Sequence, residues 1–274
     1  MAFRHGVYAS ELPTSILPAR SVDSNVVFAV GTAAVDRLAA GKPRYVNRLR
    51  MYYSYDEFVS EMGWDEDNFN KYSLQELAYS HFALYRGAPL VVCNVFDPAV
   101  HKTNVSNEAV SFDAKGAASL KHGGVSALGL QNSESSTTYV EGTDYTLNPI
   151  TGALTRTEGG SLPSEASATA SYDHADVSLV DGSDVLGGIN EATGESEGLE
   201  LVDAVFPQFR IVPGSIVCPR FSEDPAVAVV MAAASTACSR PWPSRTSRPK
   251  GKRPSGSTRR CPPTSRTTTS RTSC

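Results

Sequence analysis

The residues that could carry out catalysis are scattered along the chain rather than grouped into a motif. The nearest approach to a serine nucleophile elbow is Gly124-Val125-Ser126-Ala127-Leu128, with His122 two residues before it. That elbow needs a final glycine for its sharp turn, and Leu128 occupies the position. We therefore interpret Ser126 as part of an ordinary turn. Neither GxxxxGK[ST] nor GxGxxG is present, so the sequence predicts no nucleotide cofactor.

Acidic and imidazole side chains also lack the spacing of a metal site. Asp65-Glu66-Asp67-Asn68 is similar to the start of a calcium loop, but the central Gly and the closing Glu are missing. We predict that this segment is a solvated connector between two helices. The five histidines are far apart and none is paired with Cys at zinc-ligand spacing. They are His5, His81, His101, His122 and His174.

The two cysteines of the first 234 residues, Cys93 and Cys218, both lie in apolar segments. Such cysteines are typical of small core residues rather than nucleophiles, and unpaired thiols suit a reducing compartment. His81 falls on the apolar face of a predicted helix and is interpreted as a core residue. With no catalytic set, cofactor site or metal site in view, the sequence predicts a protein that is not an enzyme.

Composition changes abruptly near residue 235. The last forty residues hold 10 Lys+Arg, 17 Ser+Thr and no Asp or Glu, whereas the first 234 hold 15 basic and 29 acidic side chains, a net charge of −14. A body of that charge repels phosphate backbones, so no nucleic-acid partner is predicted. We interpret residues 235–274 as a disordered basic tail read from a shifted frame of a G·C-rich gene.

The apolar runs of the sequence are too short to predict a membrane-spanning helix. The longest apolar run, residues 225–234, is far shorter than the roughly 20 residues of a membrane-spanning helix. The first residues form no apolar signal sequence. We expect synthesis in the cytosol.

Strand and helix patterns alternate on both sides of residues 101–177. Residues 25–31 form a β-branched and aromatic run that ends at glycine, which is typical of a buried strand, and residues 90–96 are a second strand of the buried type. Further strands are predicted within 44–53 and 215–218. Strand, helix and strand in this order indicate an α/β layer with some parallel pairing.

Four helices are predicted to position these strands. Ser54 with Glu57, and Ser73 with Glu76, form two capping boxes, and the first helix ends at Gly63. The second carries six residues at helical spacing on one predicted buried face. They are Leu74, Leu77, Ala78, His81, Phe82 and Tyr85. Later helices are predicted from Glu197 to Phe206, before Pro207, and from Asp224-Pro225 onward.

Residues 101–177 have short Thr, Tyr, Val and Ala runs separated by turn signals, with strands predicted at 139–140, 145–147, 153–155 and 168–172. The predicted fold class is α/β, α+β overall, with an inserted antiparallel β domain. The predicted divisions are an extended N-terminal arm at 1–25, a first core part at 26–100, the β-rich insertion at 101–177, a second core part at 178–234 and the tail at 235–274.

Eight short segments between residues 3 and 234, taken in their order along the chain, resemble segments of contractile phage tail sheath proteins with a subtilisin-like core. Tyr139 to Tyr145 (YVEGTDY) looks like a β module of phage structural proteins. The strings are His5 to Glu11 (HGVYASE), Pro13 to Ile16 (PTSI), Val30 to Ala33 (VGTA), Tyr53 to Phe58 (YSYDEF), Tyr79 to Tyr85 (YSHFALY), Leu199 to Asp203 (LELVD), Val212 to Gly214 (VPG) and Asp224 to Val227 (DPAV).

The resemblance implies a structural subunit that polymerises in helical rings around a tail tube and contracts for genome injection. Its implied partners are copies of itself, the tube protein, and baseplate and tail terminator proteins. It implies a location in the virion tail, with host cytoplasm during assembly. Family members continue past the helix at Pro225 into further core strands, so the resemblance also implies a truncated or frameshifted form that folds incompletely or aggregates.

The N-terminal arm is the predicted contact between subunits. Its proline-punctuated sequence suits an extended strand added to a neighbour's sheet through main-chain hydrogen bonds. In the family such arms connect neighbouring subunits. The predicted interface residues are Val7, Tyr8, Ala9, Ser10, Glu11 and Leu12.

Two alternatives stay open from the sequence. One is an α/β hydrolase-like enzyme with a β insertion, which requires a serine, a histidine and an acid to converge. The other is a carbohydrate-binding surface protein, which requires exposed aromatic rings on one β face. The rings available in the insertion are Tyr139, Tyr145 and Tyr172.

Overall fold

A computed structural model describes residues 23–132, 137–163 and 165–239. One part is a four-stranded sheet in the order β13-β1-β3-β2. β1 (Asp23–Gly31) lies between β3 (Leu90–Asn94) and β13 (Pro213–Val217), parallel to both, and β2 (Leu49–Tyr52) pairs antiparallel with β3. All five residues of β3 are buried, as expected for a strand covered on both faces. The predicted parallel pairing is confirmed.

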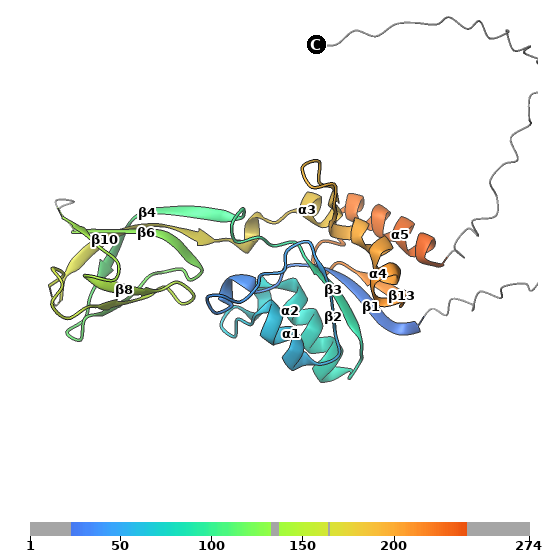
Figure 1. The fold of residues 1–274 in the computed structure, drawn as a ribbon, viewed down its shortest axis with the longest axis horizontal. Helices are drawn as coiled ribbons and strands as arrows, with labels where there is room; N and C mark the ends of the chain where they lie inside the picture. Colours follow the sequence, from blue (N-terminus) through green and yellow to red (C-terminus); the bar gives the residue numbers. More distant parts are fainter. Residues whose placement is uncertain (1–22, 133–136, 164, 240–274) are drawn as a thin grey trace, which may run out of the picture. The chain divides into compact units, whose positions relative to one another are not determined.

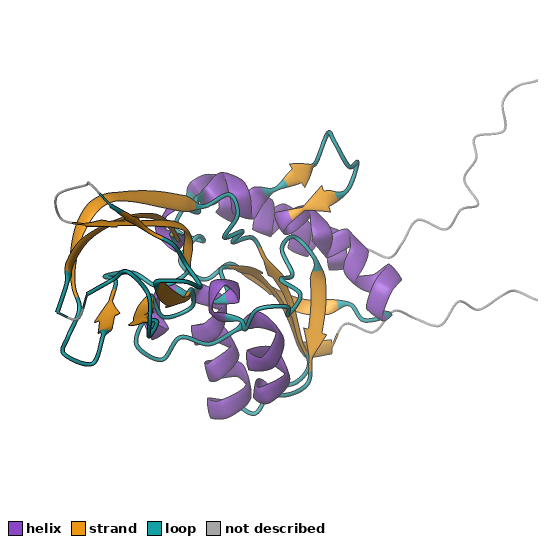
Figure 2. Ribbon diagram, turned by 60° about the vertical axis from the view of Figure 1, so that its left-hand side comes forward, coloured by secondary structure: helices purple, strands orange, loops and turns teal. Residues whose placement is uncertain are grey.

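Helices cover both faces of this sheet (Figures 1 and 2). α1 (Tyr55–Met62) and α2 (Ser73–Ala78) lie on one side, and α3 (Gly182–Leu186), α4 (Val202–Phe209) and α5 (Pro225–Ser239) on the other. We call this sheet and its helices the α/β layer. Its shorter elements are the 3-10 helices η1 (Val35–Arg37), η2 (Phe69–Lys71), η4 (Val177–Leu179) and η5 (Gly198–Leu201), the π-helix η3 (Tyr79–Leu84) and the hairpin β11 (Gly188–Ile189) with β12 (Ser196–Glu197).

Residues 102–175, which we call the β region, form two antiparallel sheets in the orders β4-β10-β6-β7 and β5-β9-β8. β10 (Ser167–Ala175) is central in the first sheet, and buried and less buried residues alternate along it, as in a sheet with one face on a core. The other strands are β4 (Lys102–Ser111), β5 (Ala117–Ser119), β6 (Val125–Asn132), β7 (Thr138–Tyr139), β8 (Tyr145–Asn148) and β9 (Ala153–Arg156).

The α/β layer and the β region bury separate hydrophobic clusters. The first is centred on residues of β1 and β3 such as Phe28 and Leu90, with Val227 of α5 also buried. The second includes Leu130 and Leu154, one from each sheet of the β region. The mixture of helices and sheets confirms the predicted α/β character. The predicted boundaries at residues 100 and 177 stay predictions, because all described residues lie in the same contact unit.

The two predicted capping boxes differ from the structure. Ser54 accepts a hydrogen bond from the Glu57 N–H at 3.3 Å, but the Glu57 carboxylate accepts from Tyr53 N–H instead of from Ser54. The box at Ser73 is wrong. Ser73 is already helical, and its hydroxyl accepts from the Thr32 N–H at 3.0 Å, because it packs against the end of β1. The predicted end of α1 at Gly63 is confirmed.

Two other helix predictions, the buried face of the second helix and the end of the helix before Pro207, are wrong. The π-helix η3 follows α2 directly, and Tyr85 at its end is 82% exposed, whereas Phe82 still packs against the core. α4 continues through Pro207 to Phe209 instead of ending before the proline. The predicted start at Asp224-Pro225 is confirmed, since the Asp224 carboxylate accepts the Ala226 N–H at 2.9 Å.

None of the helices in the described part of the chain combines the length and the apolar character needed to cross a bilayer.

Candidate functional site

The six predicted interface residues, Val7 to Leu12, lie outside the described residues. The described part offers two other features that could bind a partner. One is a polar cleft where the β region meets the α/β layer. The other is the apolar outer surface of the α/β layer.

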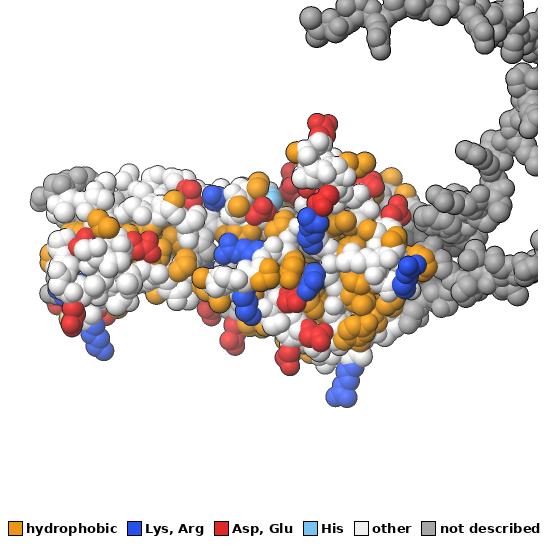
Figure 3. Space-filling view, in the orientation of Figure 1, with side chains coloured by type: hydrophobic (Ala, Val, Ile, Leu, Met, Phe, Trp, Pro, Cys, Tyr) orange, Lys and Arg blue, Asp and Glu red, His pale blue; other side chains and the backbone are white. Residues whose placement is uncertain are grey.

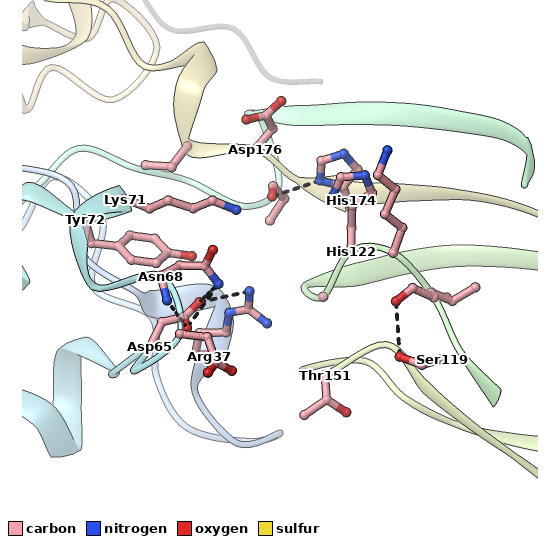
Figure 4. A pocket seen from close by; sticks show the side chains of 16 residues that line it. Arg37, Asp65, Asn68, Lys71, Tyr72, Ser119, His122, Thr151, His174 and Asp176 are labelled. Atoms are coloured by element: carbon pink, nitrogen blue, oxygen red, sulfur yellow. Dashed lines mark hydrogen bonds and ion pairs between the residues drawn. The ribbon is translucent and has the colours of Figure 1, made fainter. Parts of the chain in front are cut away.

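The cleft has a volume of about 360 Å³ and opens between the segment from Asp65 to Tyr72 and the β region (Figure 4). Figure 4 shows the side chains of Lys71 and Arg37 on one wall and those of His122 and His174 on the other. Lys71 ends the short helix η2, whereas His174 lies near the carboxyl end of β10. The site therefore depends on segments that are far apart in sequence.

Arg37 holds the α/β wall of the cleft together. Its guanidinium lies 3.0 Å from the Asp65 carboxylate and 3.4 Å from that of Asp36, and it also donates to the Ile150 carbonyl of the β region. The Tyr72 hydroxyl donates to Asp36 at 2.8 Å. Burial raises the pKa of Asp36, partly offset by the hydrogen bond from Tyr72 and the charge of Arg37. Burial likewise raises the pKa of Tyr72, so its phenol stays a donor.

The opposite wall carries two stacked imidazoles. The ring centroids of His122 and His174 are 4.1 Å apart, with 4° between the ring planes. Burial, followed by the nearby His174 and Lys121, lowers the pKa of His122. The negative charge of Glu108 opposes this lowering of the pKa. The Glu108 carboxylate accepts a hydrogen bond from the Tyr172 hydroxyl at 2.6 Å. A positive charge on His174 disfavours protonation of His122, because like charges repel.

The structure separates the residues that the sequence analysis considered for catalysis. Ser126 lies on β6, and its hydroxyl donates to the Asp173 carbonyl, whereas the ring of His122 stacks on His174. The serine is therefore engaged with backbone rather than with an imidazole. Among the described residues, no group of three or more His, Cys, Asp or Glu side chains is arranged to hold a metal ion.

Both cysteines are core residues, as predicted. Cys93 and Cys218 are free and fully buried. Burial raises the pKa of each thiol to about 12, which disfavours the thiolate that a nucleophile requires.

Two further interpretations need correction. The acidic connector is not wholly solvated, because Asp65 is only 8% exposed and accepts from Arg37 and from the Asn68 N–H at 3.0 Å. The three tyrosines that a carbohydrate-binding face would require are buried in the core of the β region and cannot stack on a sugar. They are Tyr139, Tyr145 and Tyr172.

The outer surface of the α/β layer is the second candidate site. α5 has no charged residue, and it packs Val227 inward while Val229 is 68% exposed. A surface helix normally presents polar residues outward, so its outer face is unusual. β13, the strand before it, is an edge of the described sheet, and its Gly214 and Ser215 are exposed.

Exposed apolar side chains gather on the α/β layer. Figure 3 shows hydrophobic side chains concentrated over this layer, whereas the visible face of the β region is mainly of other types. In the described residues, the large hydrophobic side chains exposed on the layer and its connections are Tyr53, Tyr79, Leu84, Tyr85, Val100, Leu179, Ile189 and Val229, against Val140 in the β region. Such patches are typical of interaction surfaces.

The sequence analysis missed most of the cleft. It noted His122 beside Ser126, and His122 and His174 among the histidines without zinc-ligand spacing, but it gave no role to Arg37, Lys71 or His174. These residues come from η1, η2, the β5–β6 connection and β10. Their lone charges carry no motif, so only the fold brings them together.

Comparison with known proteins gives two matches. Residues 98–183 match a family model described as "Protein of unknown function UCP028589". The chain is also 32% identical over 233 residues to the "Tail sheath protein" of Burkholderia phage BcepMu. That alignment covers 84% of this chain and 46% of the relative, so the chain spans about half the length of the curated relative it matches. The similarity to phage tail sheath proteins, first seen in short strings of residues, is confirmed.

Proposed function

We propose, from the premise that this chain is a homologue of a phage tail sheath protein, that it is a structural subunit of a contractile phage tail sheath. The subunit polymerises in helical rings around the tail tube, and the lattice contracts to inject the genome. Its partners are copies of itself, the tube protein, and baseplate and terminator proteins. It resides in the virion tail and, during assembly, in the host cytoplasm.

The observation that carries this proposal is the 32% identity with the tail sheath protein over most of the chain. The geometry supports it in one respect. The apolar outer face of α5 and the β13 edge lie next to each other in sequence and in the layer. A layer with such an edge is suited to association through backbone and apolar contacts rather than to catalysis.

The finer architecture belongs to the proposal. The α/β layer is taken as a subtilisin-like core, and residues 101–177 as a β domain inserted into it. Since a fold does not carry an activity, the likeness to subtilisin implies no protease. The N-terminal residues Val7 to Leu12 are taken as the strand that pairs with a neighbouring subunit.

We also propose that this chain is a truncated form. Its aliphatic and acidic residues stop near residue 235, where α5 is still apolar on its outer face. Further core strands, encoded in the original frame, would cover α5 and pair with β13. Without them the product folds incompletely or aggregates, and it does not contract as part of a working sheath.

Electron microscopy of two purified products tests the proposal. One is the chain as printed, and the other comes from a gene in which a single-base change near the codons for Ala232 to Ser239 restores an aliphatic-rich reading frame. We expect sheath-like tubes from the restored product and none from the printed chain. Contractile tubes from the printed chain would overturn the truncation, and a folded restored product that stays monomeric would overturn the sheath assignment.

A matched variant tests the arm. Proline at positions 7 and 9 of the restored product removes two backbone donors from the predicted strand. We expect tube formation to be lost in Val7→Pro/Ala9→Pro, whereas the control Val7→Ala, with Ala9 unchanged, leaves it intact. Tubes that form equally well with proline would exclude Val7 to Leu12 as the intersubunit strand.

A further inference from the structure

The cleft between the β region and the α/β layer brings several groups that can carry positive charge to one place. Lys71 comes from the α/β layer, and Lys121, His122 and His174 come from the β region. Figure 4 shows the Lys71 side chain directed across the cleft toward His174. After burial, the charges of His174, Lys121 and Lys71 also lower the pKa of His122, so these three groups lie near its ring.

The acids of the cleft are largely committed to other partners. Asp65 accepts from Arg37 at 3.0 Å and from Asn68. Asp176 accepts from the hydroxyls of Thr103 at 2.9 Å and Ser178 at 2.6 Å. Asp67 stands exposed among the lining residues.

The cations are not committed in the same way. Within the described part of the chain, the ammonium groups of Lys71 and Lys121 take part in no hydrogen bond or ion pair, and the ring of His122 makes no hydrogen bond. The hydrogen-bond donors left free in the cleft therefore belong to Lys71, Lys121 and His122. The permanent charges of its lining are equal in number, with Arg37, Lys71 and Lys121 against Asp65, Asp67 and Asp176.

We propose that this cleft binds an oxyanion of the phosphate class, held by Lys71 from one wall and by Lys121 and His122 from the other. Each ammonium group offers three donors to a tetrahedral anion, and hydrogen bonds to a charged acceptor are the stronger kind. A dianion with four oxygens matches donors from two walls better than a monoanionic carboxylate does. The volume of about 360 Å³ leaves room for a substituent on the phosphate.

Binding would connect the two parts of the molecule. The direct link already present in the cleft is the donation from Arg37 to the Ile150 carbonyl. A phosphate between Lys71 and Lys121 adds a second, charge-assisted link. It also favours the protonated form of His122, which the neighbouring cations otherwise oppose. This site does not depend on the sheath assignment, because it lies within one chain.

Titration of inorganic phosphate into the full chain, followed by calorimetry at constant ionic strength, tests the site. We expect saturable binding of one phosphate per chain and a much weaker response to acetate. The double variant Lys71→Met/Lys121→Met is expected to bind at least about ten-fold more weakly. The matched control Lys102→Met/Lys115→Met removes two exposed lysines that do not line the cleft, and it should bind like the wild type.

Three outcomes overturn the site. They are no saturable binding by the wild-type chain, equal responses to phosphate and acetate, or equal affinity in the Lys71→Met/Lys121→Met variant and the wild type. If that variant does not fold by circular dichroism, the imidazole resonances of His122 in the wild-type chain decide. Phosphate should shift them and raise the pKa of His122, and unchanged resonances contradict the proposal.

Discussion

The β region and the α/β layer bury their hydrophobic residues in different ways. In the β region, antiparallel strands alternate inward and outward side chains, and two sheets enclose a local cluster. In the α/β layer, β3 is buried along its whole length, yet in the described part of the chain α5 presents apolar side chains outward and β13 forms an edge of the sheet. The β region thus encloses its own hydrophobic cluster, whereas the α/β layer leaves an apolar helix face exposed.

The largest expected effect comes from removing a central ring of the α/β layer. Phe28 is fully buried on β1, between β3 and β13. Phe28→Ala should cost about 3–5 kcal/mol of unfolding free energy, because it leaves a cavity in the middle strand. We expect hydrogen exchange to show lost protection in β1, β3 and β13, with the amides of β10 still protected.

The reciprocal variant is Leu154→Ala, in the core of the β region. It should cost about 2–5 kcal/mol and reduce protection in β8, β9 and β10 before β1. If either substitution removes protection equally from both parts, the two clusters unfold as a unit and the comparison fails.

The strands of the α/β layer were largely predictable from sequence, whereas half of the β region's main sheet was not. Residues 25–31 and 90–96 are mainly apolar, valine-rich runs, and they contain most of β1 and β3. β4 and β6 went unnamed because sequences such as KTNVSNEAVS are mostly exposed and polar, so they show no hydrophobic contrast. The π-helical turn at Tyr79–Leu84 likewise has no sequence signal, so the sequence analysis wrongly placed Tyr85 on the buried face.

The site was less predictable than the fold. The basic side chains of the cleft come from four separate segments, and none of these side chains lies in a recognisable motif. The apolar outer face of α5 was visible as an uncharged run at residues 225–239. Its exposure could not be known until the helices that pack beside it were placed.

A second prediction concerns the buried polar residue at the end of β3. The Asn94 side chain is fully buried, accepts from the Ala33 N–H at 2.9 Å and the Phe96 N–H at 3.1 Å, and donates to the carbonyls of Tyr45 and Phe96. Asn94→Ala leaves these groups unpaired and should cost about 2–4 kcal/mol, measured by urea unfolding. Asn94→Leu keeps most of the side-chain volume but none of these hydrogen bonds, so it should cost about as much as Asn94→Ala. A much smaller loss for Asn94→Leu would mean that packing, rather than hydrogen bonding, explains Asn94.

The third prediction uses pH to distinguish the two parts. In the β region, hydrogen bonds from the Val140 N–H and then from Ser161 lower the pKa of Asp144. Its stabilising effect is therefore full above the ordinary pKa of about 3.9 and is lost as the pH falls through the folded-state pKa. In the α/β layer, burial raises the pKa of Asp36, so ionisation costs stability and acid relieves that cost.

We therefore expect acid to weaken the β region first. Hydrogen exchange at pH 6 and pH 3 should show protection falling more in β8 and β9 than in β1. Asp144→Asn should lower protection of the β region at pH 6 and reduce its further loss at pH 3. The matched control Glu158→Gln changes an exposed carboxyl group and should leave both profiles unchanged. A β1 that loses protection before β8 would contradict the assignment of these two carboxyl groups.

The smallest expected effect on stability is at α5, whose exposed apolar face has no counterpart of similar size among the described residues of the β region. Val229 is 68% exposed, so Val229→Asp should change the unfolding free energy of the printed chain by no more than about 0.5 kcal/mol. The same change should strongly reduce self-association measured by light scattering, because it places a charge on the apolar face. Val140→Asp, at a side chain 57% exposed in the β region, is the matched control and should leave association unchanged. A large loss of stability in Val229→Asp would show that the face is already covered within the chain, and unchanged association would show that it contacts no partner.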